Sequence, residues 1–436
     1  MSKKKWLSRH DFLEIIISIY LCRVLFSFPF AHLPMPWHSH HFWAAALFGS
    51  FMLLYPKAYF SKKLIPLYVF LAIRLFFIPL LWINRYHAFS TENPRVPSVE
   101  GFIYAYFPLF IALLVYFYYI ERNDYNTLSR LVRRAWFFTL CGVINQLIVL
   151  ILFPRAMMDM VRAGVIYEGL GFSEYLANIG FQGYGFLNAL SSVFPVFVYL
   201  VFKTKIKFSY KLFWVGLAII IWLVIIRGWV TAFLLFSTLF TLIAFFMKED
   251  YRKDLWRVIF IIVMVISLPT SFKADIFYKS SEFFPDSKIG LRLYDAGQTI
   301  ENPDLDYYSS TQHAGRRLGR TPLLWESFLS NPIIGSGLDS QHVAWLDMLS
   351  IYGLLGSLPW FYLVLKNFRN NLMIIPKAYS GYYMLCIVAF VSMGLLKDQG
   401  GTHVFLFWFF IVPASGFLYA ENVVEKVTMV DKNNYA

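Results

Sequence analysis

The chain has 436 residues, of which 58% are hydrophobic, 20% aromatic and only 15% charged, and its mean hydropathy is +0.55. A soluble domain carries about 25% charged residues, so this composition excludes an ordinary soluble protein and predicts a multi-spanning membrane protein. The net charge of +13 does not point to nucleic acid, because the Lys and Arg residues lie in short segments between apolar runs, as membrane topology requires.

The apolar runs predict an all-α, polytopic protein that forms a single domain over residues 1–436. A helix needs about 20 apolar residues to cross a bilayer, which gives about twelve spans. The first run contains Arg23 and lacks a small-residue cleavage site, so we expect an uncleaved span rather than a signal peptide. The predicted spans lie at about 12–30, 42–55, 64–83, 101–120, 135–153, 183–202, 211–226, 229–247, 256–271, 341–365, 379–396 and 403–420.

The distribution of basic residues predicts the orientation. The segments that would face the cytoplasm hold 24 Lys and Arg residues, whereas the short loops on the other side hold six. This asymmetry places both termini, including a polar tail at 421–436, in the cytoplasm. Two long segments, at about 154–182 and 272–340, then face the periplasm, and loops of this length usually carry function.

Polar chemistry concentrates in one stretch, from Arg316 to Gly356, which reads R-R-L-G-R-T-P-L-L-W-E-S-F-L-S-N-P-I-I-G-S-G-L-D-S-Q-H-V-A-W-L-D-M-L-S-I-Y-G-L-L-G. Thr321 is a natural N-cap and Pro322 a natural first residue of a short interfacial helix. Arg320 would then lie beside the free N–H groups of the helix start, where an anion such as diphosphate binds well. The apolar face of this helix would hold Leu324, Trp325 and Phe328.

The residues after this helix predict a fixed turn and a candidate base. The glycines of the N-P-I-I-G-S-G segment at 331–337 permit positive φ or the close approach of a substrate. Asp339 or Ser340 is expected to cap the next span, with His342 in its first turn. A helix N-terminus disfavours the protonated ring, and a neutral imidazole suits a general base that accepts a proton from a hydroxyl group.

Together these elements resemble the C-terminal signature of the O-antigen polymerase and ligase superfamily, of the Wzy and WaaL types. Two departures stand out: Val343 replaces the usual Asn, and the family's Arg-to-Trp spacing is often shorter, so Arg316 or Arg317 is an alternative to Arg320. A second family mark, Ser-Arg-Gly, appears as Ile226-Arg227-Gly228. The matching residues are Arg320, Trp325, Pro332, Gly335, Gly337, His342, Gly353 and Gly356.

The resemblance implies a GT-C-like transmembrane fold and a glycosyltransferase of the bacterial inner membrane with its active site facing the periplasm. It implies an undecaprenyl-diphosphate-linked oligosaccharide as donor, inversion at the anomeric carbon, and neither a metal nor another cofactor. Its partners would be membrane lipids and a chain-length regulator, with no nucleic acid. The catalytic residues would be His342, Arg320 and Arg227, and the substrate-binding residues Arg316, Arg317, Gly335, Gly337, Arg155 and Arg162.

Three functions stay open at this point. The two unequal long loops favour a polymerase, which joins the glycan to another lipid-linked repeat. A ligase would instead join it to the lipid A core. A flippase or another transporter of lipid-linked oligosaccharide belongs to a different class; transporters usually show two related halves, and this sequence shows none.

Several other polar residues have less specific patterns. We interpret Asp304 and Asp306 as part of a solvated loop rather than as a metal-binding D-x-D pair. The histidines His38, His40 and His41 are interpreted as an interfacial loop. Three charged residues within apolar runs are expected to face the bundle interior, where they line a lipid-carrier groove or form structural pairs; they are Arg23, Arg74 and Asp347.

Overall fold

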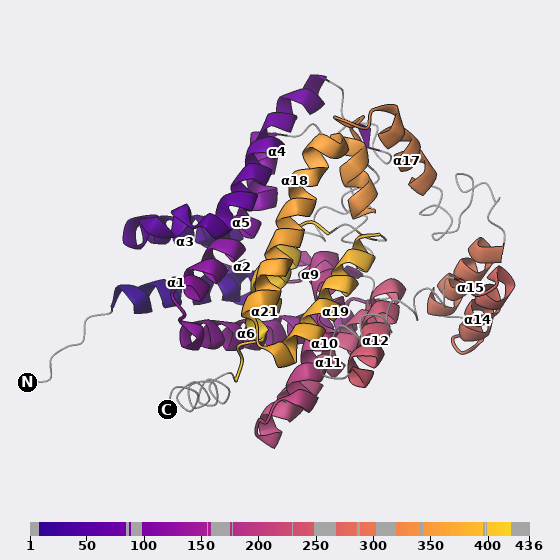
Figure 1. Ribbon diagram of the computed structural model, residues 1–436. Coiled ribbons are helices and arrows are strands. Elements are labelled where there is room, and N and C mark those ends of the chain that lie inside the picture. The colour runs from indigo at the N-terminus through magenta and orange to yellow at the C-terminus, as the bar shows by residue number, and fades with distance from the viewer. Residues whose placement is uncertain are drawn as a thin grey trace, which may run out of the picture.

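The helices of the protein follow the apolar runs of its sequence, as the computed structural model in Figure 1 shows. The structure describes residues 8–83, 87–88, 98–154, 156–157, 175–176, 178–228, 230–247, 267–285, 288–301, 320–339, 343–395, 397 and 399–419. The helices of the first half are α1 (Arg9–Leu25), α2 (Phe28–Ala31), α3 (His40–Leu54), η1 (Pro56–Phe60), η2 (Lys62–Leu64), α4 (Ile65–Ile83), α5 (Val99–Glu121), α6 (Tyr125–Leu152), α9 (Gly183–Ser191), α10 (Phe194–Val198) and η4 (Tyr199–Lys203). Those of the second half are α11 (Phe208–Arg227), α12 (Thr231–Phe246), α14 (Thr270–Glu282), α15 (Lys288–Glu301), α17 (Arg320–Ser330), α18 (Ala344–Ile374), α19 (Lys377–Gly394), α20 (Thr402–Leu406), η5 (Phe407–Ile411) and α21 (Val412–Ser415).

Five helices are long and apolar enough to cross a membrane: α4 with η2, α5, α6, α11 and α18. A sixth span results if α9 and the α10–η4 segment, which bend by 49°, count as one. The apolar helices α3, α12 and α20 to α21 are shorter. The protein is therefore a helical membrane protein, as predicted, but the predicted number of twelve spans is not confirmed. Most of the predicted span at 256–271 lies outside the described residues.

Side-chain caps explain why three of the apolar helices begin where they do. Ser8, Ser98 and Asp124 each accept a hydrogen bond from the backbone N–H three residues further on, at 3.1, 2.9 and 3.1 Å. Such a cap satisfies one of the N–H groups that a helix start leaves without a partner.

A buried carboxylate joins α1 to α6. Glu14 is only 6% exposed, and it accepts hydrogen bonds from Arg130 Nη2 and from Arg134 Nη1, both at 2.9 Å. The Arg134 guanidinium also donates to Ser18 Oγ at 2.8 Å. Because a buried charge is stable only when it is paired and hydrogen-bonded, this network fixes α1 against α6.

The segment at 272–340, predicted as a long periplasmic loop with a short helix near its end, contains α15, α17 and nearly all of α14. Helices α14 and α15 form a hairpin that stands to one side of the main bundle in Figure 1. The Tyr278 hydroxyl donates to Glu301 Oε2 at 2.7 Å across this hairpin, and that hydrogen bond raises the pKa of Tyr278 to about 12. Of the predicted loop at 154–182, the structure describes only residues 154, 156–157, 175–176 and 178–182, and the tail at 421–436 lies outside the described residues.

A short parallel strand pair joins the segment after α4 to the segment after α17. The strands are β1 (His87–Ala88) and β2 (Leu338–Asp339), with His87 opposite Leu338. Helix α4 also packs along α18. The strand pair and this packing together bring the ends of α4, α17 and α18 to one end of the molecule (Figure 1).

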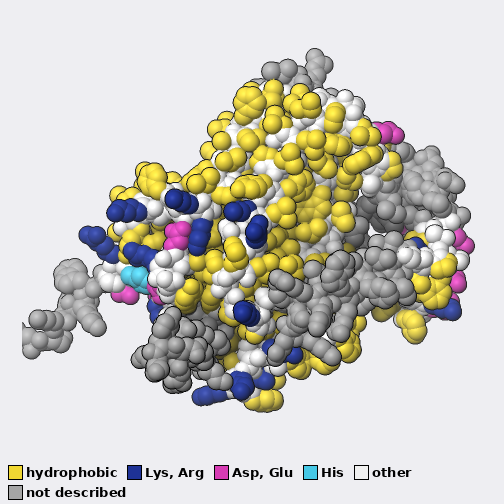
Figure 2. All heavy atoms as spheres, viewed as in Figure 1, with side chains coloured by type: hydrophobic (Ala, Val, Ile, Leu, Met, Phe, Trp, Pro, Cys, Tyr) yellow, Lys and Arg dark blue, Asp and Glu magenta, His cyan; other side chains and the backbone are white. Residues whose placement is uncertain are grey.

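The Lys and Arg side chains are unevenly distributed over the surface. In Figure 2 the Lys and Arg side chains gather at the left and lower parts of the molecule, the side on which α1 begins, and a broad hydrophobic surface lies above them. A positively charged face beside an apolar belt is typical of the cytoplasmic side of a membrane protein.

We expect the segment that contains α14, α15 and α17 to lie on the opposite, periplasmic side. A reporter active only in the cytoplasm, fused at residue 304, is therefore expected to be silent. The same reporter fused at residue 205, between η4 and α11, is expected to be active. Activity at residue 304 together with silence at 205 would invert the topology.

Candidate functional site

Helix α17 begins at Arg320, two residues before the predicted first helical residue Pro322, and its apolar face is narrower than expected. Leu324 is fully buried and Phe328 is 8% exposed, because residues four apart lie on the same face of a helix. Trp325 is 47% exposed, and its ring stacks at an angle on Phe328 with the centroids 5.5 Å apart. Thr321 lies within the helix, so its predicted role as N-cap is wrong.

The N-P-I-I-G-S-G segment is the fixed turn that the sequence predicts. The Gly335 N–H donates to the Asn331 carbonyl at 2.8 Å, which continues the helical hydrogen-bond pattern beyond α17. Gly335 then has φ +79° and Gly337 φ +83°. Both lie in the left-handed region that glycine adopts without strain, so the expectation of positive φ at these glycines is confirmed.

Helix α18 is broken at Gly353, which the sequence did not predict. This residue has φ +58° and ψ −164°, so the chain forms a short arm at 344–352 and a long arm at 354–374. Figure 1 shows the chain turning back at the top of α18. The Ser357 hydroxyl donates to the Met348 carbonyl at 2.8 Å, which places the two arms side by side. The predicted span at 341–365 is therefore wrong, since only the long arm has the length to cross the membrane unbroken.

The turn after α17 packs against the break in α18 and forms hydrogen bonds with both arms. The N–H groups of Leu354 and Leu355, at the start of the long arm, donate to the carbonyls of Pro332 and Ile333 at 2.8 and 2.9 Å. In the other direction, the Ser336 N–H donates to the Ser350 carbonyl of the short arm at 2.8 Å. The turn thus satisfies backbone groups that the interruption of α18 would leave without partners.

Glycine is required at two points where these backbones meet. A Cβ at Gly335 would lie 2.4 Å from the Ile351 carbonyl oxygen, and a Cβ at Gly353 would lie 2.4 Å from the Ile333 carbonyl oxygen. Real Cβ atoms do not approach backbone so closely. Backbone packing therefore accounts for Gly335, and its predicted substrate contact, like that of Gly337, stays a prediction.

Three serine hydroxyls tie the turn to both helices, and the sequence analysis missed them. Ser327 of α17 is hydrogen-bonded to Ser336 of the turn, and its Oγ lies 2.7 Å from the Oγ of Ser350 in the short arm. Serines occur throughout the chain, and no spacing in the sequence marks these three. The cluster makes α17, the turn and the short arm one hydrogen-bonded unit.

Asp347, whose role the sequence left open, caps the short arm. The Val343 N–H donates to Asp347 Oδ2 at 3.0 Å, and Asp347 is only 7% exposed. The short arm begins at Ala344 with Val343 at the N-cap position, so the predicted caps Asp339 and Ser340 are wrong. His342 lies outside the described residues, two positions before the first residue of the short arm in the sequence.

Arg23 and the nearby histidines form a structural group. Arg23 Nε donates to the His38 carbonyl at 2.5 Å and so joins the end of α1 to the segment before α3. His40 and His41 are the first residues of α3, not part of a loop as predicted, and their ring centroids lie 3.8 Å apart. Among the described residues, no group of three His, Cys, Asp or Glu side chains is placed to hold a metal ion.

Arg74 lies near the middle of α4 and is 2% exposed. Its Cζ lies 3.3 Å from the ring centroid of Tyr352 and 5.4 Å from that of Phe70. Its three nitrogen atoms have no hydrogen-bond acceptor among the described residues.

Burying the Arg74 guanidinium in this environment costs free energy. A guanidinium stays charged in a protein, and moving an ion from water into a protein interior costs several kcal/mol. A desolvated cation–π contact returns about 2 kcal/mol of this. Among the described residues, the cation–π contacts of Arg74 therefore offset only part of the cost of its burial.

Arg227 lies at the end of α11, in the tight hairpin that the sequence predicts. The Gly228 N–H donates to the Val224 carbonyl at 2.8 Å, and α12 begins three residues later at Thr231. The Arg227 side chain is exposed. Helix α12 packs against α10 and α19, whereas α17 packs against α18, and the two helices lie apart in Figure 1. The described residues therefore do not bring Arg227 to the turn.

Several other predicted site residues, or their side chains, lie outside the part of the chain that the structure describes. Arg320 is the first residue of α17, and its side chain is not among the described ones. The remaining ones lie outside the described residues; they are Arg155, Arg162, Asp304, Asp306, Arg316 and Arg317.

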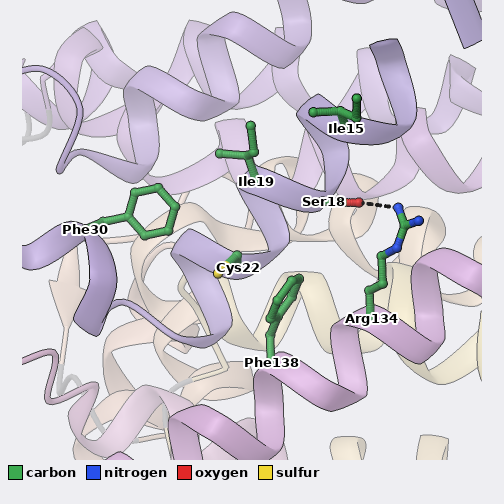
Figure 3. Close-up of a pocket in the computed structure, with 7 residues that line it drawn as sticks. All are labelled: Ile15, Ser18, Ile19, Cys22, Phe30, Arg134 and Phe138. Atoms are coloured by element: carbon green, nitrogen blue, oxygen red, sulfur yellow. Dashed lines mark hydrogen bonds between the residues drawn. The ribbon is translucent and has the colours of Figure 1, made fainter. Parts of the chain in front are cut away.

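An apolar groove of about 380 Å³ lies away from this site, along α1, α2 and α6 (Figure 3). Arg134 provides its polar end, where the guanidinium donates to Ser18. Such a groove has the character of a lipid-facing surface. It is lined by Ile15, Ser18, Ile19, Cys22, Phe30, Arg134 and Phe138.

No protein-family model matches this chain, and no curated protein matches it. Function must therefore be argued from the residues and their geometry. The candidate functional site is therefore the hydrogen-bonded unit formed by α17, the turn at 331–337 and the two arms of α18.

Proposed function

We propose that the protein is a polymerase of bacterial surface polysaccharide, an O-antigen or a capsule. It transfers a glycan from undecaprenyl diphosphate to the end of another lipid-linked repeat on the periplasmic face of the inner membrane. One observation carries the proposal. The described residues that resemble the family signature, between Trp325 and Gly356, belong to one unit in which hydrogen bonds join the turn to α18.

The chemistry needs few groups, because diphosphate is already a good leaving group. Arginines stabilise the negative charge that develops on the diphosphate as the glycosidic bond breaks. We assign this role first to Arg320, with Arg316 and Arg317 near it in the sequence. Arg227 keeps this role only as the resemblance implies it, since the described residues do not bring it to the turn. His342 accepts the proton of the attacking hydroxyl. A single in-line displacement inverts the anomeric carbon.

A deletion strain separates this function from its alternatives. Loss of a polymerase leaves single repeats on the carrier lipid at the periplasmic face. Loss of a ligase leaves long polymer on the carrier, and loss of a flippase leaves single repeats on the cytoplasmic face. Analysis of the carrier-linked glycans, with protease-protected vesicles to assign the face, therefore decides among the three. Long carrier-linked polymer in the deletion strain would contradict the proposal.

We expect the transfer to need no metal ion, because the arginines neutralise the diphosphate. The polymerisation rate of purified protein should therefore survive chelation with EDTA, and the Asp304→Ala variant should match the wild type. A loss of rate that Mg²⁺ or Mn²⁺ restores would contradict this prediction and would make Asp304 and Asp306 candidate ligands.

A further inference from the structure

The proposed function assigns no role to the buried guanidinium of Arg74. It lies within the apolar bundle, where charged residues are rare and usually mark a ligand or ion path. Its nitrogen atoms are buried and have no acceptor among the described residues. The guanidinium carries five N–H donors in a planar fork, which fits the oxygens of a carboxylate or phosphate.

The surroundings of Arg74 restrict the kind of anion that it would meet. The side chains around it are aromatic: Tyr352, Phe70 and, packed edge-on against Tyr352, Phe77. The next residues along α4, Leu75 and Phe76, are 47% and 61% exposed on the outer surface of the helix. Because α4 is long and apolar enough to cross a membrane, we expect these exposed side chains to face lipid. An anion that arrives by this route needs an apolar chain of its own.

Tyr352 connects Arg74 to the hydrogen-bonded unit described above. It is the last residue of the short arm, directly before the break at Gly353. Gly356 lies so close to Tyr352 and Phe77 that a Cβ there would be 2.6 and 3.0 Å from them. The Tyr352 ring, which covers the guanidinium, therefore lies directly beside the break in α18 at which the turn after α17 forms its hydrogen bonds.

We propose that Arg74 binds the phosphate of an isoprenoid phosphate lipid, which displaces the Tyr352 ring from the guanidinium. This inference rests on the proposed function for the choice of lipid, since the carrier in that reaction is an isoprenoid diphosphate. Arg74 holds the lipid phosphate beside the turn, and the residues of the α17–α18 unit act on the glycan.

The test uses full-length protein in nanodiscs, with farnesyl diphosphate as the probe. We expect farnesyl diphosphate to raise the melting temperature of the wild type, whereas farnesol and inorganic diphosphate do not. In Arg74→Met the affinity for farnesyl diphosphate should fall by about 10- to 100-fold, the range expected for lost hydrogen bonds to a charged group. Arg74→Lys keeps the charge without the fork and should bind with intermediate affinity.

Stability without ligand provides the second readout. Because Arg74 is charged and buried, with no acceptor among the described residues, Arg74→Met should melt at or above the temperature of the wild type. Arg23→Met is the matched control: it removes a hydrogen bond to the His38 carbonyl, so it should melt lower while farnesyl diphosphate binding is unchanged. Wild-type affinity in both Arg74 variants would overturn the proposal. So would a melting temperature of Arg74→Met below that of Arg23→Met, since Arg74 would then be a structural residue.

The proposed function and this inference fail separately. Binding that depends on Arg74 in a protein that does not polymerise lipid-linked repeats would sink the proposed function and leave the binding site. Polymerisation at the wild-type rate by an Arg74→Met variant that also binds farnesyl diphosphate normally would leave the function and remove the site. An effect of inorganic diphosphate equal to that of farnesyl diphosphate would overturn the requirement for a lipid chain.

Discussion

Replacing Gly353 with alanine is expected to destabilise the protein by on the order of 4 kcal/mol, from backbone strain and overpacking together. Gly353 has φ +58° and ψ −164°, a conformation that residues with a Cβ rarely adopt. Its Cβ would also lie 2.4 Å from the Ile333 carbonyl oxygen and 2.5 Å from the Gly335 nitrogen. Both neighbours are backbone atoms of the turn, so neither can move without breaking the hydrogen bonds that close α18.

The measurement is the melting temperature of purified protein, together with the amount of folded protein in the membrane. Gly216→Ala, in the middle of α11, is the control, because a Cβ there meets nothing within 4 Å. Alanine in a helix interior is favoured over glycine by about 1 kcal/mol, so this control should melt at or slightly above the wild type. The same increase for Gly353→Ala would mean that α18 is one continuous helix and that the break does not exist.

Gly335→Ala should reproduce the effect of Gly353→Ala, because the two glycines meet across the same contact. The double variant should lose less than the sum of the two single losses, since the first substitution already separates the turn from α18. Simple additivity would show that the two residues act at independent places.

The break in α18 shows where sequence reasoning reaches its limit. The run that contains G-L-L-G is apolar on both sides, and composition alone predicts one continuous span. What interrupts the helix is a set of hydrogen bonds from Leu354 and Leu355 to carbonyls about twenty residues earlier in the chain. Periodicity describes neighbours along one helix, so it cannot report such a long-range contact.

Local features were predicted better than distant ones. The positive φ of Gly335 and Gly337 follows from residue types within one or two turns, and the structure confirms it. The start of α17 at Arg320 lies two residues before the predicted start at Pro322. The number of spans was not confirmed, because the predicted spans include apolar helices, such as α3, that are too short to cross a bilayer alone. The meeting of Arg74 with Tyr352 depends on how α4 packs along α18, which no local pattern encodes.

The largest effect on activity is expected from the histidine at the start of the α18 unit. If His342 accepts the proton of the acceptor hydroxyl, His342→Ala should lower the polymerisation rate on the order of 10²- to 10⁴-fold. Binding of the lipid-linked donor should be nearly unchanged, because the histidine acts on the acceptor. Arg320→Ala should cost on the order of 10²- to 10³-fold in rate through lost charge stabilisation. Arg320→Lys should also be impaired, because lysine keeps the charge but not the two-point contact with diphosphate.

The assay for these variants is polymerisation of purified lipid-linked repeat, paired with a donor-binding measurement for each protein. His38→Ala is the matched control, since it removes a histidine ring and keeps the backbone carbonyl that Arg23 uses. It should polymerise at the wild-type rate. His342 precedes α18 in the sequence and Arg320 is the first residue of α17, so we expect their variants to fold and insert. A near-normal rate for His342→Ala would end its assignment as the base. The acceptor would then have to lose its proton to water, and catalysis would depend on the arginines that stabilise the departing diphosphate.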